Sequence, residues 1–433
     1  MQFDLFDSRG AENISLDEVF EAYYDCRKNK RRTANALKFE LDFERELVQL
    51  WHDINSNNYK IGRSIAFIVR NPVQREVFAA NFRDRIVHHL VINKINHLFE
   101  DDFIFDSYSC RKGKGVLCGV RRLKEQIEQC SRFYERDCYI LKLDIRSFFM
   151  SIDKRILFKN LKKFIAEKYH FADKPVLLRL IKQIVFYNPE DNCLVKGNIS
   201  DWNGLPFYKS LFWSSRYCGL PIGNLTSQVF ANFYLNKLDK FVCEVLGAEY
   251  YGRYVDDFFI IHQDKEFLLN AAKKIDSFLS SNLRLSLHPQ KFYLQHYKKG
   301  VRFVGAVVKP ERIYIGNRTK GNLYQKISLM LPKLRERIEN KLCELGSFAT
   351  SINSYLGFMR HYNTYNLRTH ILQKLDSTFL GRVSDLDEHA RKFVVKKEFK
   401  PSKAKQVRLQ KQHKYRKRNN SKRYKYLIKE KEK

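Results

Sequence analysis

Two short stretches decide the fold: LKLDIRSFFMSID, residues 141–153, and RYVDDFFII, residues 253–261. In the first, apolar β-forming residues run directly into Asp144, and aromatic residues and a helix-like segment follow. In the second, hydrophobic β-formers flank Asp256 and Asp257, which is typical of a hairpin with acids at its turn. Two adjacent aspartates in such a setting are costly unless cations or solvent compensate them. An ordinary turn is the alternative interpretation of the pair taken alone.

Asp144 and Asp256 are separated by 112 positions, which leaves room for a strand, several helices and a hairpin that returns to the same sheet. Nucleotidyl transfer needs carboxylates from two strands, because they hold two Mg²⁺ ions about 4 Å apart. One ion activates the primer 3′-oxygen, and the other stabilises the departing pyrophosphate. The two stretches together therefore favour a metal-dependent transferase site, since hard oxygen ligands suit Mg²⁺.

The segments around these stretches predict a chain of mixed α and β structure. Apolar residues at three- and four-residue spacing predict helices at residues 37–54, 75–99 and 271–282, and two or three helices between 320 and 375. Runs of β-forming residues predict short strands at residues 64–69, 139–145, 292–295 and 301–308.

Net charge is the strongest signal in the composition. The 433 residues include 80 Lys and Arg against 48 Asp and Glu, for a formal charge of +32. Such a field attracts polyanions, and the interleaved aromatic residues, 14% of the chain, are suited to stacking on bases. A nucleic-acid partner is therefore favoured over an anionic membrane surface and over a merely soluble basic protein.

Length and composition set further bounds. The length suits two or three subdomains around a large core, and a hydrophobic fraction of 44% excludes global disorder. No run of 18 apolar residues is present, and the first twenty residues are acidic where a signal peptide is basic, so we expect no membrane partner and a cytoplasmic location. The nine cysteines include no CxxC pair, which predicts reduced packing residues.

The composition changes near the end of the chain. Residues 390–433 hold 19 Lys or Arg and 3 acidic residues, so they carry +16, half of the total charge. This pattern predicts a basic tail that is disordered or becomes ordered on nucleic acid. A solvated tail without a specific role is the alternative.

Several motifs resemble those of reverse transcriptases, in the same order. The two opening stretches and GLPIGNLTSQVFANFYLNKLD, between them at 219–239, resemble the A, C and B motifs of the family. Other segments resemble its fingers, palm and thumb motifs: REVFAANFRDRIVHHLV (75–91), SYSCRKGKG (107–115), HPQKFYLQ (288–295), RFVGAVV (302–308) and SINSYLGFMRHYNTYNLR (351–368). The resemblance covers roughly residues 20–375.

The resemblance implies an α+β right-hand polymerase fold with fingers, a palm built on an antiparallel sheet, and a helical thumb. It divides the chain into an N-terminal helical region (1–60), fingers (61–138), a palm with inserted helices (139–312), a thumb (313–389) and the basic tail (390–433). It implies an RNA template, a DNA or RNA primer and deoxynucleoside triphosphates as partners.

By the same resemblance, Asp144 bridges both metal ions and Asp256 supplies the second shared carboxylate. Asp257 supports the site less directly, and the backbone carbonyl of Ile145 is a further ligand. The implied cofactor is a pair of Mg²⁺ ions, with Mn²⁺ as the alternative.

Other residues are assigned to the nucleotide. Phe149 matches the aromatic gate that excludes a ribose 2′-hydroxyl, and a core phenylalanine is the alternative. Arg111 and Lys112 match residues that grip the triphosphate, where charged donors and nearby glycines suit phosphate oxygens; Arg75 is a further candidate. Lys291 matches a lysine beside the leaving pyrophosphate and is a candidate general acid. An exposed surface lysine is the alternative there.

The B motif departs from the common QGxxxSP pattern. Ile222 replaces the Gln, Gly223 is kept, and Gln228 replaces the Pro; all three are assigned to the nucleotide site. Isoleucine keeps the bulk but loses every hydrogen bond, so discrimination that depended on the amide should fall. With KSLF (209–212) upstream, the pattern resembles the error-prone enzymes of diversity-generating retroelements. That subclass implies cDNA that mutagenises a target gene, and a small basic accessory protein as partner.

Two alternatives remain at this point. One is a defence-associated or group-II-intron-like reverse transcriptase. The other, of a different class, is a catalytically inactive RNA-binding protein that kept the fold. The second explains the charge, but a carboxylate cluster inside a polyanion groove repels its ligand unless metal ions are bound.

Overall fold

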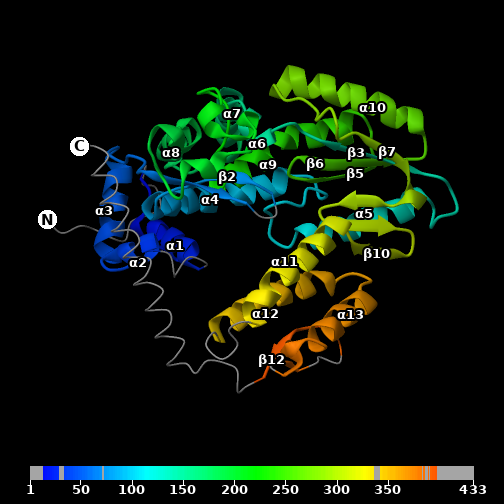
Figure 1. Cartoon of the computed structure of the whole chain (residues 1–433). Helices are drawn as coiled ribbons and strands as arrows, with labels where there is room; N and C mark the ends of the chain where they lie inside the picture. The colour runs from blue at the N-terminus through cyan, green and yellow to red at the C-terminus, as the bar shows by residue number, and fades with distance from the viewer. Residues whose placement is uncertain are drawn as a thin grey trace. The chain divides into compact units, whose positions relative to one another are not determined.

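The computed structural model describes residues 13–28, 34–70, 73–335, 342–382, 384–385, 389 and 391–396 (Figure 1). The chain divides into two compact units, Met1–Val304 and Gly305–Lys433. The helices of the first unit are α1 (Leu16–Arg27), α2 (Ala34–Phe39), α3 (Phe43–Asn55), α4 (Phe82–Asp102), α5 (Val116–Cys130), α6 (Phe148–Ser151), α7 (Lys154–Lys168), α8 (Lys174–Phe186), α9 (Leu225–Lys240) and α10 (Lys265–Phe278).

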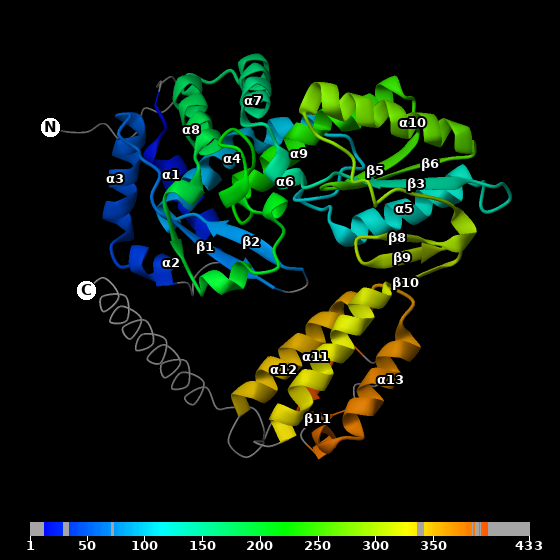
Figure 2. The same ribbon diagram turned by 45° about the horizontal axis from the view of Figure 1, so that its top comes forward.

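The first unit contains a four-stranded antiparallel sheet in the order β5-β6-β3-β7. Helices α10 and α5 cover opposite faces of this sheet (Figure 2). Tyr251, Phe258 and Ile260 belong to the main hydrophobic core, whereas Phe259 meets the ring of Phe303 at 5.1 Å. The strands of this sheet are β3 (Tyr139–Asp144), β5 (Tyr250–Tyr254), β6 (Asp257–His262) and β7 (Tyr293–His296). The first unit ends with strand β8 (Val301–Phe303).

Local signals set several helix starts in this unit. Ser15 and Glu18 form a capping box at α1, with Ser15 Oγ accepting from Glu18 N at 3.3 Å and Glu18 Oε2 accepting from Ser15 N at 3.0 Å. At α7, Asp153 Oδ1 accepts from the backbone N–H groups of Arg155 and Ile156. Helix α4 lies between α1 and α9 and is buried along most of its length, which makes it a central support of the unit.

One predicted helix is wrong over its first seven residues. Residues 75–79 form strand β2 (Arg75–Ala79), which pairs antiparallel with β1 (Ser64–Val69), and the helix begins only at Phe82. In this stretch Glu76 and Phe78 are buried between more exposed neighbours, so burial alternates with a period of two. Pairing with β1 overrides the helical spacing, because it satisfies the backbone hydrogen bonds along one edge of β1. Strand β4 (Cys193–Val195) pairs parallel with the other edge.

The second unit begins with an antiparallel hairpin of β9 (Ala306–Lys309) and β10 (Arg312–Ile315). Three helices follow, α11 (Asn317–Arg335), α12 (Leu342–Met359) and α13 (Tyr365–Asp376), and a two-residue ladder joins β11 (Ser384–Asp385) to β12 (Val394–Val395). Phe393 is buried, and both its backbone groups bond the Asn353 side chain of α12.

The predicted fold class is confirmed, because the structure combines helices with antiparallel sheets. The expected helices between 320 and 375 are present. The predicted basic tail lies outside the described residues apart from 391–396, and those six pack near α12 through Phe393. Among the described residues, no helix is both long and apolar enough to cross a membrane. Among the described residues, free thiols are present at Cys110, Cys118, Cys130, Cys138, Cys193, Cys218 and Cys243.

Candidate active site

The structure places the three predicted aspartates at the same end of the four-stranded sheet. Asp144 ends β3, and its direct partner across the antiparallel ladder is Asp257, the first residue of β6. Asp256 lies in the turn just before, and its carbonyl accepts from the Ile145 N–H at 3.2 Å. Side chains directly opposite in an antiparallel pair share one face, so the register places the carboxylates of Asp144 and Asp257 side by side.

The hairpin turn is strained and is held from several sides. Val255 has a φ of 58°, a left-handed conformation that is unfavourable for a β-branched residue. Its N–H donates to Ser109 Oγ at 3.3 Å, and its carbonyl accepts from Arg253 Nη1 at 3.0 Å. These contacts, together with the hydrogen bond from Ile145 N–H to the Asp256 carbonyl, hold the backbone of the turn that carries Asp256 and Asp257.

A fully buried ion pair lies behind this turn. Arg253 on β5 donates from Nε and Nη2 to both carboxylate oxygens of Asp239 on α9, at 2.7 and 2.6 Å, and neither side chain is exposed to solvent. Tyr251 Oη also donates to Asp239, at 2.6 Å, and Arg253 reaches Asn232 and Ser107 as well. The pair therefore connects the hairpin to α9 and to the 107–109 segment.

Electrostatics at the aspartates favour a cation. Burial, then the neighbouring Asp144, raises the pKa of Asp256 to about 6, while Lys291 and Arg75 oppose that rise. Burial also raises the pKa of Asp257 to about 6, although Lys142 lies 3.0 Å from its Oδ1 and opposes the change. Lys291 Nζ donates to Asp144 Oδ2 at 2.8 Å. The carboxylates are thus crowded and only partly compensated.

The donor set fits a hard divalent ion in its chemistry. Three carboxylates on adjacent positions supply oxygen ligands, and an added positive charge would offset both the burial and the mutual repulsion that raise the two pKa values. Within the described residues, however, no group of three His, Cys, Asp or Glu side chains is gathered closely enough to hold a metal ion. The metal assignment to Asp144, Ile145, Asp256 and Asp257 therefore stays a prediction.

Phe149 and Ile222 pack against the same small hydrophobic cluster. Both side chains are half-buried, and the cluster consists of Ala66, Phe78, Met150 and Leu211. The Phe149 carbonyl accepts from Leu220 N at 2.8 Å, which ties the segment after Asp144 to the loop before α9. Phe148, beside Phe149, is buried in the main core.

Gly223 occupies a position in that loop that a side chain would disturb. Its φ is 121°, and a Cβ there would lie 2.8 Å from Val77 Cγ1 and 3.3 Å from the Phe78 carbonyl oxygen. The neighbouring Ile222 carbonyl accepts from Phe78 N at 3.0 Å, so the loop is docked on β2. The glycine permits that close approach.

We expect Gly223→Ala to lower the free energy of unfolding by about 3 kcal/mol, because it adds a clash to the backbone strain. Gly247→Ala is the matched control: its φ is also positive, at 67°, but a Cβ there meets no atom within 4 Å. It should cost only about 1 kcal/mol. Equal losses in urea unfolding would contradict the docking role of Gly223.

The predicted phosphate ligands fall into two groups. Lys291 and Arg75 act on Asp256 and so lie near the aspartates, and Arg75 and Lys112 are exposed. Arg111 is engaged with the protein: its side chain is 7% exposed, and it donates to Glu100 at 2.8 Å and to the carbonyls of Ile104 and Ser107. These bonds hold the segment that carries Lys112, and the assignment of Arg111 to the phosphates stays a prediction.

Gln228 is exposed near the start of α9, and its Oε1 lies 3.5 Å from Cys110 Sγ. One turn further along, Asn232 exchanges bonds with Ser109, whose hydroxyl also holds the strained turn. The sequence did not single out five residues that hold this site: Ser109, Asn232, Arg253, Asp239 and Lys142. Arg253 and Lys142 lie inside the two opening stretches. A charged residue within an apolar strand was the sequence signal that could have identified them.

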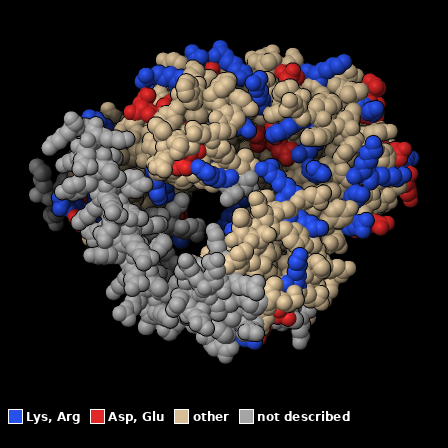
Figure 3. Space-filling view, viewed as in Figure 1, with Lys and Arg blue, Asp and Glu red and all other residues tan. Residues whose placement is uncertain are grey.

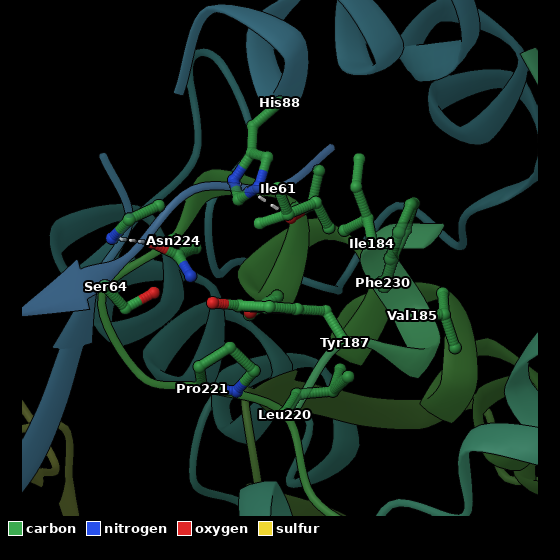
Figure 4. A pocket seen from close by; sticks show the side chains of 13 residues that line it. Ile61, Ser64, His88, Ile184, Val185, Tyr187, Leu220, Pro221, Asn224 and Phe230 are labelled. Atoms are coloured by element: carbon green, nitrogen blue, oxygen red, sulfur yellow. Dashed lines mark hydrogen bonds between the residues drawn. The ribbon is translucent and has the colours of Figure 1, made fainter. Parts of the chain in front are cut away.

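A small cavity lies behind the loop and should not be confused with a nucleotide site (Figure 4). Its volume of about 20 Å³ is room for roughly one water molecule. Burial lowers the pKa of His88 in its wall to about 3, so this imidazole is neutral, and Thr226 Oγ1 lies 3.4 Å from its Nδ1. The wall of the cavity is formed by residues of α4, α8 and α9, the start of β1 and the loop before α9.

Comparisons with known proteins extend this description. A family model described as "Reverse transcriptase (RNA-dependent DNA polymerase)" matches residues 74–308. The putative COX1/OXI3 intron 2 protein of Saccharomyces cerevisiae is 22% identical over 362 residues, which cover 70% of this chain and 36% of that protein. Protein YkfC of Escherichia coli is 23% identical over 332 residues, which cover 69% of this chain and 76% of that protein.

Solved structures with a similar course of the chain include two telomerases. Apo telomerase from Candida tropicalis aligns with a TM-score of 0.44 and 14% identity, over 74% of this chain and 59% of that one. Telomerase from Candida albicans aligns with a TM-score of 0.42 and 11% identity, over 73% of this chain and 58% of that one. The chain thus spans little more than half the length of these structures.

Proposed function

The chain belongs to the reverse transcriptase family, and from that premise we propose that it synthesises DNA on an RNA template at Asp144, Asp256 and Asp257. The observation that carries this proposal is the register of the sheet, which pairs Asp144 with Asp257 beside the strained turn that presents Asp256. The Lys and Arg side chains spread over the face seen in Figure 3 suit a polyanionic template and primer.

We assign the two Mg²⁺ ions, or Mn²⁺ in their place, to Asp144, Asp256 and the Ile145 carbonyl, with Asp257 supporting them. Bound there, the ions would supply Lewis-acid activation of the primer 3′-oxygen and charge stabilisation of the leaving group. Lys291, which bonds Asp144 and acts on Asp256, would give a proton to the departing pyrophosphate. Lys142 holds Asp257 in place by charge.

The incoming deoxynucleotide would lie against Phe149, Ile222, Gly223 and Gln228, with Arg75 and Lys112 on its phosphates. Phe149 is half-buried and packs against two hydrophobic clusters, which restrict its side chain. A restricted ring at this position would act as a gate that excludes a ribose 2′-hydroxyl. Arg111 stays in this set beside Lys112, and its guanidinium is paired with Glu100. In this proposal residues 61–138 are the fingers, 139–312 the palm and 313–389 the thumb.

Primer extension tests the proposal directly. Purified full-length chain, an RNA template with an annealed primer, Mg²⁺ and deoxynucleotides should give extended DNA, and chelation of the metal should stop it. A chain that binds RNA but extends no primer with either Mg²⁺ or Mn²⁺ is the catalytically inactive RNA-binding protein of the alternative interpretation.

We further propose that the enzyme copies with low fidelity, as in a diversity-generating retroelement. The support is Ile222, which packs on apolar residues and offers no hydrogen bond toward a nucleotide. Such an enzyme would mutagenise a target gene and work with a small basic accessory protein.

Ile222→Gln should lower misincorporation opposite template adenines by roughly fivefold, the equivalent of one hydrogen bond of about 1 kcal/mol. Sequencing cDNA made from a defined RNA by the variant and by the original chain measures this. Ile222→Leu, which adds no hydrogen bond, is the control. Accurate copying by the original chain, unchanged in the variant, would contradict the proposal.

A group-II-intron-like enzyme is the second candidate, and one observation favours it: one relative is an intron 2 protein. Sequencing the RNA and cDNA that co-purify with the chain separates the two. Intron RNA would support this candidate, and a template repeat copied with adenine-specific errors would support the retroelement. A defence-associated role and a cytoplasmic location stay predictions.

A further inference from the structure

The segment between α8 and α9, residues 188–219, has little regular structure but is anchored on strand β2. Glu76 of β2 is 1% exposed and accepts three hydrogen bonds from this segment: Trp202 Nε1 at 2.7 Å, Ser210 Oγ at 2.6 Å and Leu211 N at 2.7 Å. The Phe212 ring lies 5.3 Å from that of Phe78. A charged anchor and a ring contact therefore fix the backbone of the segment.

The outer side of the same segment exposes large aromatic rings. Within eleven consecutive residues, five aromatic side chains are between 41% and 76% exposed: Phe207 (70%), Tyr208 (41%), Phe212 (41%), Trp213 (76%) and Tyr217 (48%). Exposed aromatic side chains that gather in this way on an ordered backbone mark an interaction surface. We name these five residues the aromatic platform.

The platform reaches the candidate active site and is lined with cations. The guanidinium carbon of Arg146, two residues beyond Asp144, lies 5.6 Å from the Tyr208 ring centroid. Lys209 Nζ lies 5.9 Å from the same ring, and Arg155 lies 5.0 Å from the Tyr217 ring. The Tyr217 carbonyl accepts from Lys154 N at 2.9 Å, so the end of the segment runs beside the chain that follows Asp144.

We propose that the aromatic platform binds the unpaired nucleotides of the RNA template that have not yet reached the aspartates. The inference rests on the proposed function and adds a specific binding surface to it. Bases stack on exposed rings without regard to sequence, and neighbouring Lys and Arg meet the phosphates. Positive charge interleaved with rings suits a single strand better than an apolar protein partner, which would leave the cations unpaired.

Tryptophan fluorescence gives a direct test. The chain has three tryptophans; Trp51 and Trp202 donate their indole N–H to Ile14 and Glu76, whereas Trp213 is 76% exposed. Single-stranded RNA should quench the emission of the full chain, and Trp213→Phe should abolish most of the change. Heparin, a polyanion without bases, should displace RNA from the chain without itself quenching.

Template overhang provides the second test. We would compare KM for primer-templates with a one-nucleotide and a ten-nucleotide RNA overhang, in the original chain and in the double variant Phe207→Ala/Trp213→Ala. Removal of a stacking ring weakens binding about 5- to 150-fold, so the variant should lose at least a tenfold advantage of the long overhang. Phe133→Ala/Phe171→Ala is the matched control, because these rings are 76% and 64% exposed elsewhere.

The outcomes are distinct. Emission that RNA leaves unchanged, or an overhang advantage that both double variants keep, overturns the platform. So does a concentration-dependent dimer of the original chain that only the platform variant loses, since the rings would then bind a second copy. Failure of the original chain to extend even the short-overhang substrate overturns the proposed function instead.

Discussion

Replacement of Asp256 by asparagine is expected to lower kcat for primer extension by about 10³-fold or more, while the metal-free protein becomes more resistant to heat. The loss follows because an amide cannot supply the charge that would hold a divalent ion at the site of reaction. The gain in stability follows because the carboxylate is crowded by Asp144 and partly withdrawn from water, which raises its pKa. Primer extension and thermal unfolding, each with and without Mg²⁺, measure both effects.

Magnesium itself provides the internal check. Millimolar Mg²⁺ should raise the melting temperature of the original chain, because a ligand that binds only the folded state stabilises it, and should raise that of Asp256→Asn much less. Asp264→Asn is the control, because Asp264 caps α10 away from the aspartates. Retained activity in Asp256→Asn, or equal stabilisation of both chains by Mg²⁺, would remove this carboxylate from the reaction.

The second large effect concerns the buried pair of Arg253 and Asp239. Asp239→Leu should lower the free energy of unfolding by about 3–5 kcal/mol, because it leaves the guanidinium buried without its partner. Lys240→Met, which breaks the partly exposed pair with Asp102, should cost less than about 1 kcal/mol. Urea unfolding followed by tryptophan emission measures both.

A double variant separates stability from positioning. Arg253→Met with Asp239→Leu replaces the ion pair by apolar side chains and should recover most of the lost stability. It should not recover kcat, because the bond from Arg253 Nη1 to the Val255 carbonyl is also gone, and a displaced turn costs roughly 100-fold. If kcat returned together with stability, the pair would serve the core alone.

Much of the fold followed from local patterns, but the helix predicted at 37–54 is broken into α2 and α3, and the strand predicted at 301–308 into β8 and β9. The change of a predicted helix into strand β2 has a clear physical cause. The strands at 64–69 and 139–144 and the acidic hairpin were visible because apolar β-formers there are bounded by turn residues. Residues 75–79 were assigned to a helix because their spacing continued that of α4. Their pairing with β1 depends on a contact between segments, which no local pattern contains.

The candidate active site was also predictable only in part. The pairing of the Asp144 strand with the acidic hairpin was predictable, because both stretches read as strands of one sheet with the acids at their ends. The role of Ser109, which bonds both Asn232 and the Val255 N–H, was not, since it arises where three distant segments meet. The motif around Arg111 suggests a phosphate ligand, and no local pattern indicated that its guanidinium pairs with Glu100.

The pairing of Asp144 with Asp257 has a consequence for how the chain can vary in length. Side chains alternate along a strand, so one residue inserted into β3 or β6 would turn one aspartate to the opposite side of the sheet. Insertions in the loops that join the two strands leave this pairing unchanged. Related chains should therefore show gaps in those loops more often than in the two strands themselves.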